Sequence, residues 1–139
     1  MRALLDTCVL SELNRKGGSS QVRTAVDALE DEDLYISAIT VGELTKGVLR
    51  LPPGKRRSEL TTWLLALRQH YSGRILAVDE DTAELWGEIA AHAEARGKII
   101  PALDGLIAAT AMQHGLHILT RNTDDFLATG AMLSNPWES

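Results

Sequence analysis

Five side chains with carboxylate or amide oxygens stand beside apolar segments of this sequence. They are Asp6, Glu43, Asp104, Asn122 and Asp125. Carboxylates next to core segments are costly unless a partner neutralises them, and a hard divalent cation binds oxygen ligands of this kind. The sequence therefore predicts a metal site, and a metal-dependent nuclease is the hypothesis that it favours.

Each of these residues also has a purely structural explanation. Asp6 can cap the helix that begins near Cys8, and Asp104 lies near a helix N-terminus, where the helix dipole favours an anion. Glu43 follows Thr40 by three residues, which is the spacing of a capping box. The Asn-Thr-Asp-Asp run at 122–125 is ordinary turn chemistry. Only the combination of segments can decide between structure and chemistry.

The chain has 139 residues, and its composition is that of an ordinary globular protein. Apolar residues make up 45% and charged residues 24%, so we expect one domain over 1–139. Asp6 interrupts the N-terminal apolar run, which argues against a signal peptide, and no membrane span is expected, so we expect a cytoplasmic location. The lone Cys8 has no internal disulfide partner and is expected to be a packed thiol.

The net charge of −5 argues against a protein that holds nucleic acid by charge alone. A bound divalent ion would reverse the local sign at an acidic site, and basic residues elsewhere could guide a strand. The candidate basic residues are Arg15, Lys16, Lys46, Arg50, Lys55, Arg56 and Arg57. With such an ion bound, the net charge of −5 argues neither for nor against nucleic-acid binding.

Apolar spacing predicts short strands that alternate with amphipathic helices. Strands are expected at 3–5, 34–36, 75–78, 117–119 and 131–133, and helices at 8–13, 20–29, 40–50, 58–71, 80–96 and 101–114. Short strands separated by helices imply parallel pairing with right-handed crossovers. The expected class is therefore α/β, with a short, mostly parallel central sheet flanked by helices in three layers, α/β/α.

The rule for ligand sites in open α/β sheets connects these residues. Ligands gather outside the carboxyl ends of the strands. Asp6 directly follows the first expected strand, and Asn122 follows the strand that ends at Leu119. Glu43 and Asp104 are expected in the first turns of helices, from which their side chains could reach the same place. We therefore expect one pocket built from separated segments.

The order of these segments resembles PIN-domain proteins, specifically toxin ribonucleases of the VapC and FitB type. The landmarks are Leu-Leu-Asp-Thr, Ser-Ala-Ile-Thr-Val-Gly-Glu-Leu, Asp-Gly-Leu-Ile-Ala-Ala-Thr-Ala, Thr-Arg-Asn-Thr-Asp-Asp-Phe and Asn-Pro-Trp, over residues 4–137. The resemblance implies a PIN-like fold and metal-dependent hydrolysis of RNA phosphodiester bonds. It also implies that Asp6, Glu43 and Asp104 bind Mg²⁺ or Mn²⁺ in a central cleft.

The fourth acidic position of the family is where this sequence departs from part of it. FitB-like relatives carry Asp where Asn122 stands, whereas many VapC-like relatives have Asn there, followed by an Asp-Phe pair whose Asp is Asp125 here. An amide oxygen can ligate a hard cation or orient its water but adds no negative charge. One firmly held ion is expected, and either Asn122 or Asp125 could fill the fourth position.

The resemblance also implies roles and partners. An ion on Asp6 and Asp104 would activate a water that Glu43 places or deprotonates. Proteins of this type form homodimers. They are inhibited by an antitoxin, which supplies operator DNA binding and with which larger assemblies can form. A groove between the helices at 40–50 and 58–71 would suit an amphipathic antitoxin tail.

Two other functions remain open on the sequence. A non-catalytic PIN-like module could use the acidic cleft only to receive a basic antitoxin tail, which Asn122 makes conceivable. An aspartyl-phosphate phosphotransfer enzyme also places Asp after the first strand of an α/β sheet. Its dehalogenase-like form needs a second Asp where Cys8 stands, and its receiver-like form needs a late Lys that cannot be located. Metal-dependent RNA cleavage would separate the nuclease from the binding module.

Overall fold

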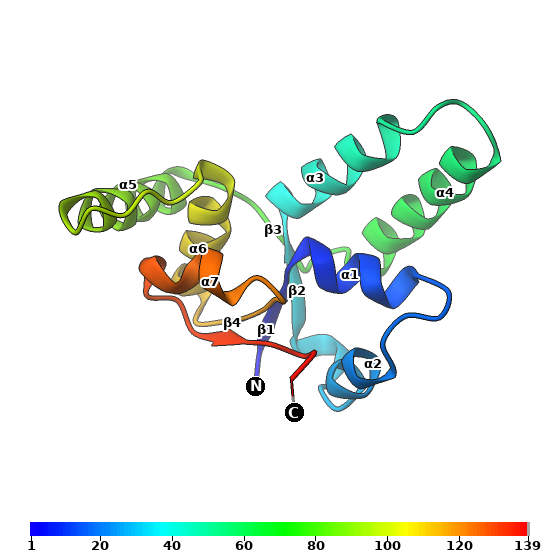
Figure 1. The fold of residues 1–139 in the computed structure, drawn as a ribbon, viewed down its shortest axis with the longest axis horizontal. Coiled ribbons are helices and arrows are strands. Elements are labelled where there is room, and N and C mark those ends of the chain that lie inside the picture. The colour runs from blue at the N-terminus through cyan, green and yellow to red at the C-terminus, as the bar shows by residue number, and fades with distance from the viewer. Residues whose placement is uncertain (139) are drawn as a thin grey trace.

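The computed structural model describes residues 1–138 as short strands alternating with helices (Figure 1). The strands are β1 (Ala3–Leu5), β2 (Leu34–Ser37), β3 (Ile75–Leu76), β4 (His117–Leu119) and β5 (Leu133–Ser134). The α-helices are α1 (Thr7–Asn14), α2 (Ser20–Asp27), α3 (Ala38–Leu49), α4 (Lys55–His70), α5 (Glu80–Ala95), α6 (Ala102–His114) and α7 (Thr123–Phe126). Two 3-10 turns complete the order, η1 (Asp31–Asp33) and η2 (Leu127–Thr129).

Within these residues the strands form one sheet in the order β3-β2-β1-β4-β5, and all four strand pairs are parallel. The chain moves outward from β1 in one direction through β2 and β3, and β4 then returns to the other side of β1. The crossovers therefore change direction between β1 and β4. In a sheet of this kind the crevice at that change of direction is the expected ligand site.

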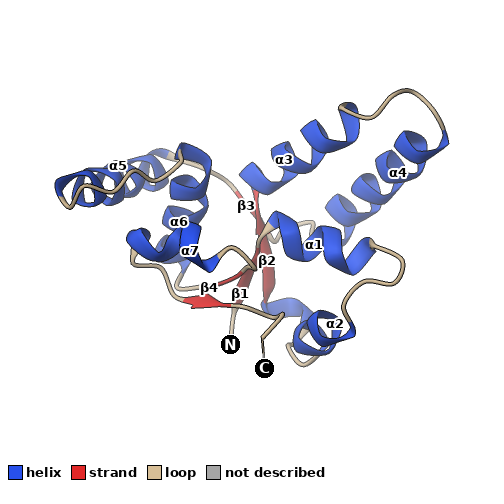
Figure 2. Ribbon diagram, in the orientation of Figure 1, coloured by secondary structure: helices blue, strands red, loops and turns tan. Residues whose placement is uncertain are grey.

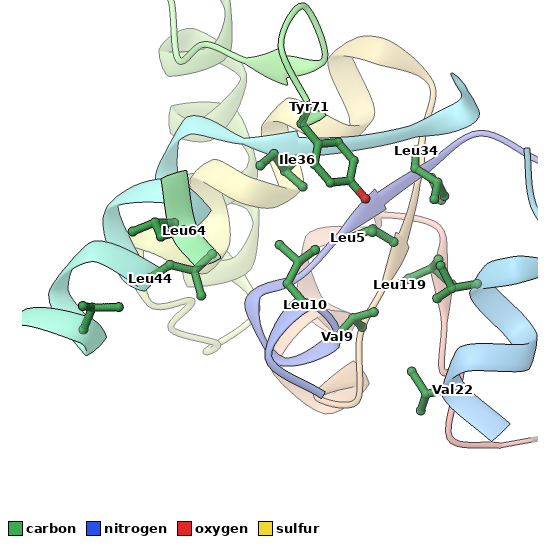
Figure 3. Packing of buried hydrophobic residues seen from close by; sticks show 13 residues of the cluster. Leu5, Val9, Leu10, Val22, Leu34, Ile36, Leu44, Leu64, Tyr71 and Leu119 are labelled. Atoms are coloured by element: carbon green, nitrogen blue, oxygen red, sulfur yellow. The ribbon is translucent and has the colours of Figure 1, made fainter. Parts of the chain in front are cut away.

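Helices cover both faces of the sheet, which gives the expected three layers (Figure 2). Helices α1 to α4 lie on one side, and α5 to α7 on the other. Successive strand residues point to opposite faces. Leu5 and Leu119 accordingly pack with Val9 and Leu10 of α1 (Figure 3), while their neighbours Leu4 and Ile118 pack against α6. The predicted α/β architecture is confirmed.

Two predicted strands differ from the observed ones by two residues at one end, because pairing sets their limits. The strand expected at 75–78 ends at Leu76, since its partner β2 ends at Ser37, which is opposite Leu76. The edge strand expected at 131–133 is observed at Leu133–Ser134, where it pairs with Ile118 and Leu119 of β4. Neither limit could be read from a single apolar run.

The predicted start of the third helix was wrong. Helix α3 begins at Ala38, and its cap is Ser37, whose hydroxyl accepts the amide hydrogen of Ile39 at 3.0 Å. Thr40 is fully buried, and its hydroxyl has no hydrogen-bond partner among the described residues. The capping box of Thr40 and Glu43 is therefore not formed, and Glu43 lies in the second turn of α3 rather than the first.

None of the helices between residues 1 and 138 combines the length and the apolar character needed to cross a lipid bilayer.

Candidate active site

The candidate site lies at the carboxyl edge of the sheet, beside the ends of β1 and β4. Asp6 directly follows β1, and its backbone amide donates to the carbonyl of Leu119, the last residue of β4, at 3.0 Å. Thr120 follows β4 and lies close to Asp6. The sheet therefore brings these two strand ends together at the crossover reversal.

Asp6 is buried, with 7% of its surface exposed, and it has three neighbours that bind or contact its carboxylate. It is the N-cap of α1, where Oδ1 accepts the amide hydrogen of Thr7 at 2.9 Å. Oδ2 accepts the hydroxyl hydrogen of Thr120 at 2.7 Å and lies 3.7 Å from the Sγ of Cys8. The structural explanation of Asp6 as a cap is thus correct, and the same carboxylate also faces the candidate site.

Glu43 reaches the same place from α3. Its Oε1 accepts the hydroxyl hydrogen of Thr7 at 3.0 Å, and Thr7 is the residue after Asp6. The side chain of Glu43 is half-buried. The hydroxyl of Thr7 therefore orients the carboxylate of Glu43, and the hydroxyl of Thr120 orients that of Asp6. Such hydrogen bonds fix the direction of a candidate metal ligand.

Asp104 lies in the first turn of α6, as predicted, and carries the clearest electrostatic sign of a shared site. Burial first, and then the charges of Asp6, Asp125 and Glu43 in that order, together raise the pKa of this carboxyl from 3.8 to about 6. A carboxyl surrounded by other carboxylates resists ionisation because like charges repel. Four acidic residues thus influence one another's charge: Asp6, which caps α1, and Glu43, Asp104 and Asp125 of α3, α6 and α7.

The position of Asp104 is set by close packing between α5 and α6. The next residue, Gly105, is buried against Trp86 of α5. A Cβ atom at position 105 would lie 2.7 Å from Cδ1 and 2.9 Å from Nε1 of Trp86, closer than real carbon atoms approach. Only glycine lets the first turn of α6 sit this close to α5, and Asp104 stands directly before it.

Asp125 lies in the short helix α7 and Asn122 directly precedes it, in a segment where the sequence predicted a turn. Asn122 is the exposed residue before the helix, its side chain does not cap it, and its backbone amide donates to the Thr120 hydroxyl at 3.0 Å. Asp125 is exposed, and its charge acts on Asp104. The buried Phe126 anchors α7 in the core. Asp125 is therefore the member of this segment whose charge reaches the cluster.

Cys8 is a neighbour of the site that sequence reasoning did not assign to it. The thiol is half-buried, contacts Asp6 and Thr120, and accepts the backbone amide hydrogen of Arg121 at 3.5 Å. Burial is the largest of the causes that raise its pKa. The thiol is thus packed, as predicted. Its place two residues after Asp6, in the first turn of a helix, is the signal that could have located it.

The chemistry of the donors fits a hard divalent cation. The cluster offers only carboxylate oxygens from its four acidic residues, and an amide oxygen from Asn122 stands on the same segment as Asp125. Oxygen ligands of this type are those that Mg²⁺ and Mn²⁺ prefer. In the arrangement found, however, no three His, Cys, Asp or Glu side chains within residues 1–138 are close enough together to hold one ion. These carboxylates would have to come closer together to share one ion.

A groove of about 710 Å³ adjoins the acidic cluster, between α1, α3 and α4. Thr7 and Glu43 line it and connect it to the candidate site. Its lining also includes apolar residues and basic residues: Leu44, Val48, Leu60 and Trp63, and Arg15, Lys16 and Arg56. A groove beside the helices at 40–50 and 58–71 is therefore present, as the sequence predicted.

The chain is thus an α/β protein with a parallel sheet in the order β3-β2-β1-β4-β5. Its acidic site lies at the carboxyl edge of the sheet, where the crossovers change direction between β1 and β4. The PIN domain family matches residues 3–131, so this chain belongs to that family. The predicted resemblance to PIN-domain proteins of the VapC and FitB type is confirmed by individual relatives.

Toxin FitB from Neisseria gonorrhoeae is 44% identical over 135 residues, which cover 96% of this chain and 97% of the relative. VapC ribonuclease Y4jK from Sinorhizobium fredii is 41% identical over 136 residues, with 97% of each chain covered. The crystal structure of FitAcB from Neisseria gonorrhoeae contains a chain that superposes with a TM-score of 0.93 at 43% identity and 99% coverage of both chains. The fold and the family are thus shown over nearly the whole chain.

Proposed function

We propose that this chain is a metal-dependent endoribonuclease and the toxin of a type II toxin-antitoxin pair. The observation that carries the proposal is the placing of Asp104 where burial, and then the charges of Asp6, Asp125 and Glu43, raise its pKa to about 6. Carboxylates placed near one another destabilise the fold by mutual repulsion, and a bound cation would offset that repulsion. Similarity to proteins named Toxin FitB and VapC ribonuclease supports this function.

We assign Asp6, Asp104 and Glu43 as the residues that would hold Mg²⁺ or Mn²⁺. Such an ion, when bound, would polarise the phosphate and lower the pKa of a water molecule. Asp125 is the better candidate for the fourth acidic position because its charge acts on Asp104. Asn122 would orient water or a phosphate oxygen through its amide. One ion per chain is expected, since Asn122 adds no charge.

Glu43, Thr7 and Thr120 would each support hydrolysis of the RNA phosphodiester bond. Glu43 would take a proton from the attacking water, whose oxygen forms a bond to phosphorus while the bond to the leaving oxygen breaks; the leaving oxygen keeps the electron pair and takes a proton from solvent. The hydroxyl of Thr7 holds Glu43 in place for this step. The hydroxyl of Thr120 and the amide of Thr7 fix both oxygens of Asp6, so that its orientation is set before substrate binds.

We further propose an antitoxin as the protein partner and a homodimer as the assembled form. The groove between α1, α3 and α4 has an apolar lining and opens beside Glu43. An amphipathic helix from the antitoxin would pack its apolar face there, and a basic side chain from the same tail would reach the acidic cluster. The site of action would be the cytoplasm, where RNA is present.

The test of the proposed function is cleavage of a labelled RNA pool by the purified chain, with no antitoxin present. We expect cleavage in Mg²⁺ or Mn²⁺, none in EDTA, and recovery when the ion is restored. Mapping of the cut sites would identify the RNA target. Absence of cleavage in both ions, by folded protein, would reject the nuclease and favour the binding module instead.

A further inference from the structure

We infer that Arg121 is a phosphate-binding residue of this site and that Trp137 is the positioning residue that holds its guanidinium ready. This inference rests on the proposed function and names a residue that would contact the substrate backbone. Arg121 is the arginine of the Thr-Arg-Asn segment, and Trp137 is the tryptophan of the Asn-Pro-Trp segment.

The topology places both residues at the carboxyl edge of the sheet. Arg121 comes after β4, and Trp137 comes after β5, which is parallel to β4 and beside it. The strand partner of β4 on its other side is β1, which is followed by Asp6. Figure 1 shows the C-terminal segment leaving β5 and crossing toward the side of α2. Asp6, Arg121 and Trp137 thus follow the ends of three adjacent parallel strands.

Hydrogen bonds fix the backbone of Arg121 beside the acidic cluster. Its amide donates to the Sγ of Cys8, and that sulfur lies 3.7 Å from Oδ2 of Asp6. The residue before it, Thr120, donates to the same carboxylate. The Arg121 amide is therefore one sulfur atom away from the carboxylate of Asp6, a residue that would hold the metal ion.

The side chain of Arg121 is held without any carboxylate. Its Cζ lies 5.1 Å from the centre of the Trp137 ring, a cation–π contact, and within residues 1–138 it makes no ion pair. Stacking occupies one face of a guanidinium and leaves its N–H groups at the edge to donate. Arg121 is exposed, so these donors are open to a ligand.

Trp137 is itself fixed, which makes it a firm support. It is half-buried and packs against the hydrophobic cluster that includes Val9 and Leu10. Its amide donates to Oδ1 of Asn135 at 2.9 Å, and the amide of Thr120 donates to the carbonyl of Ser134 at 3.0 Å. The indole therefore restricts the position of the guanidinium before RNA arrives, on a residue whose backbone lies next to Cys8 and Asp6.

An arginine so held suits a phosphate near the scissile one. Four carboxylates repel an RNA backbone, and an arginine that they do not neutralise supplies an attractive, bidentate donor at the rim. Arg74 offers a contrast, because its guanidinium binds Asp31 and backbone carbonyls and has no such freedom. The chemistry that Arg121 recognises is a single-stranded phosphodiester backbone.

The test compares Arg121→Met with Arg68→Met, which removes the same charge from an exposed position on α4. Binding of a short fluorescein-labelled single-stranded RNA of mixed sequence is measured by anisotropy in Ca²⁺ over a range of salt, and KM and kcat are measured in Mg²⁺. For Arg121→Met we expect KM to rise about tenfold and the slope of log K against log salt to flatten by about 0.7, one phosphate contact on a single strand. Arg68→Met should change neither.

Trp137 is tested by Trp137→Leu, alone and combined with Arg121→Met. Alone it should raise KM about threefold, and in the Arg121→Met background it should raise KM no further, because its effect acts through Arg121. Equal effects of Trp137→Leu in both backgrounds, or an Arg121→Met protein that matches Arg68→Met in KM and salt slope, would overturn the inference. If wild-type protein binds RNA but does not cleave it, the nuclease function is rejected, and the salt slopes still test the role of Arg121. If wild-type protein does not bind RNA, the nuclease function and the role of Arg121 are both rejected.

Discussion

Replacing Asp104 by Asn is expected to lower the rate of RNA cleavage by at least about a hundredfold. The substitution keeps the shape of the side chain and removes the charge on which Asp6, Glu43 and Asp125 act. An amide in this place binds a hard cation more weakly than a carboxylate. Single-turnover cleavage of labelled RNA in Mg²⁺ would measure the loss.

Asp6→Asn should lower the rate of RNA cleavage as much as Asp104→Asn does. Unlike Asp104→Asn, it should also lower the stability of the fold. Its carboxylate is the cap of α1 and accepts hydrogen bonds from Thr7 and Thr120, so an amide loses one of these acceptors. The matched control is Asp27→Asn, an exposed position at the end of α2. Cleavage by Asp104→Asn at the rate of Asp27→Asn would remove Asp104 from the site.

In EDTA the Asp104→Asn protein is expected to be more stable than wild type at about pH 8, by about 1 kcal/mol. The folded-state pKa of Asp104 is raised to about 6 from its ordinary value of 3.8, so folding penalises its charged form. The penalty is absent below about pH 4, grows as pH rises through about 6, and is complete above about 7. A two-unit shift would correspond to a larger energy at a fully buried group, but Asp104 is only half-buried, and solvent screens part of it.

Urea unfolding of both proteins at about pH 4 and about pH 8 measures this difference. Wild type and variant should have equal free energies of unfolding at the lower pH and separate at the higher one. Adding Mg²⁺ or Mn²⁺ at the higher pH should raise the stability of wild type and leave Asp104→Asn nearly unchanged, because binding to the folded state stabilises it. A gap that does not change with pH would show that Asp104 ionises freely, against the crowding of charges described above.

Local apolar patterns predicted the sheet and the acidic strand ends well. The run Ala3-Leu4-Leu5 followed by Asp6 has one physical solution, a buried strand whose first polar residue emerges at the sheet edge. The helix that starts after Pro101 and contains Asp104 in its first turn was likewise fixed by local signals. These elements depend on near neighbours in the sequence, which is why the sequence was sufficient.

Features that depend on pairing or competition between caps were not predictable in this way. Ser37 and Thr40 are both residue types that cap helices, and the end of β2 selects Ser37. The hydrogen bonds of Thr7 to Glu43 and of Thr120 to Asp6 join residues far apart in the chain. No periodicity encodes such contacts. The nuclease roles of Asp6, Glu43, Asp104, Asn122 and Asp125 remain predictions.

We expect the acidic cluster to hold a cation, and a Mn²⁺ titration followed by electron paramagnetic resonance would show this, since the free ion gives the signal. At about pH 8, where Asp104 is ionised, we predict one bound ion per wild-type chain and a large loss of affinity in Asp104→Asn, with Asp27→Asn unchanged. Equal Mn²⁺ binding by wild type and Asp104→Asn, or none by folded wild type, would contradict the account.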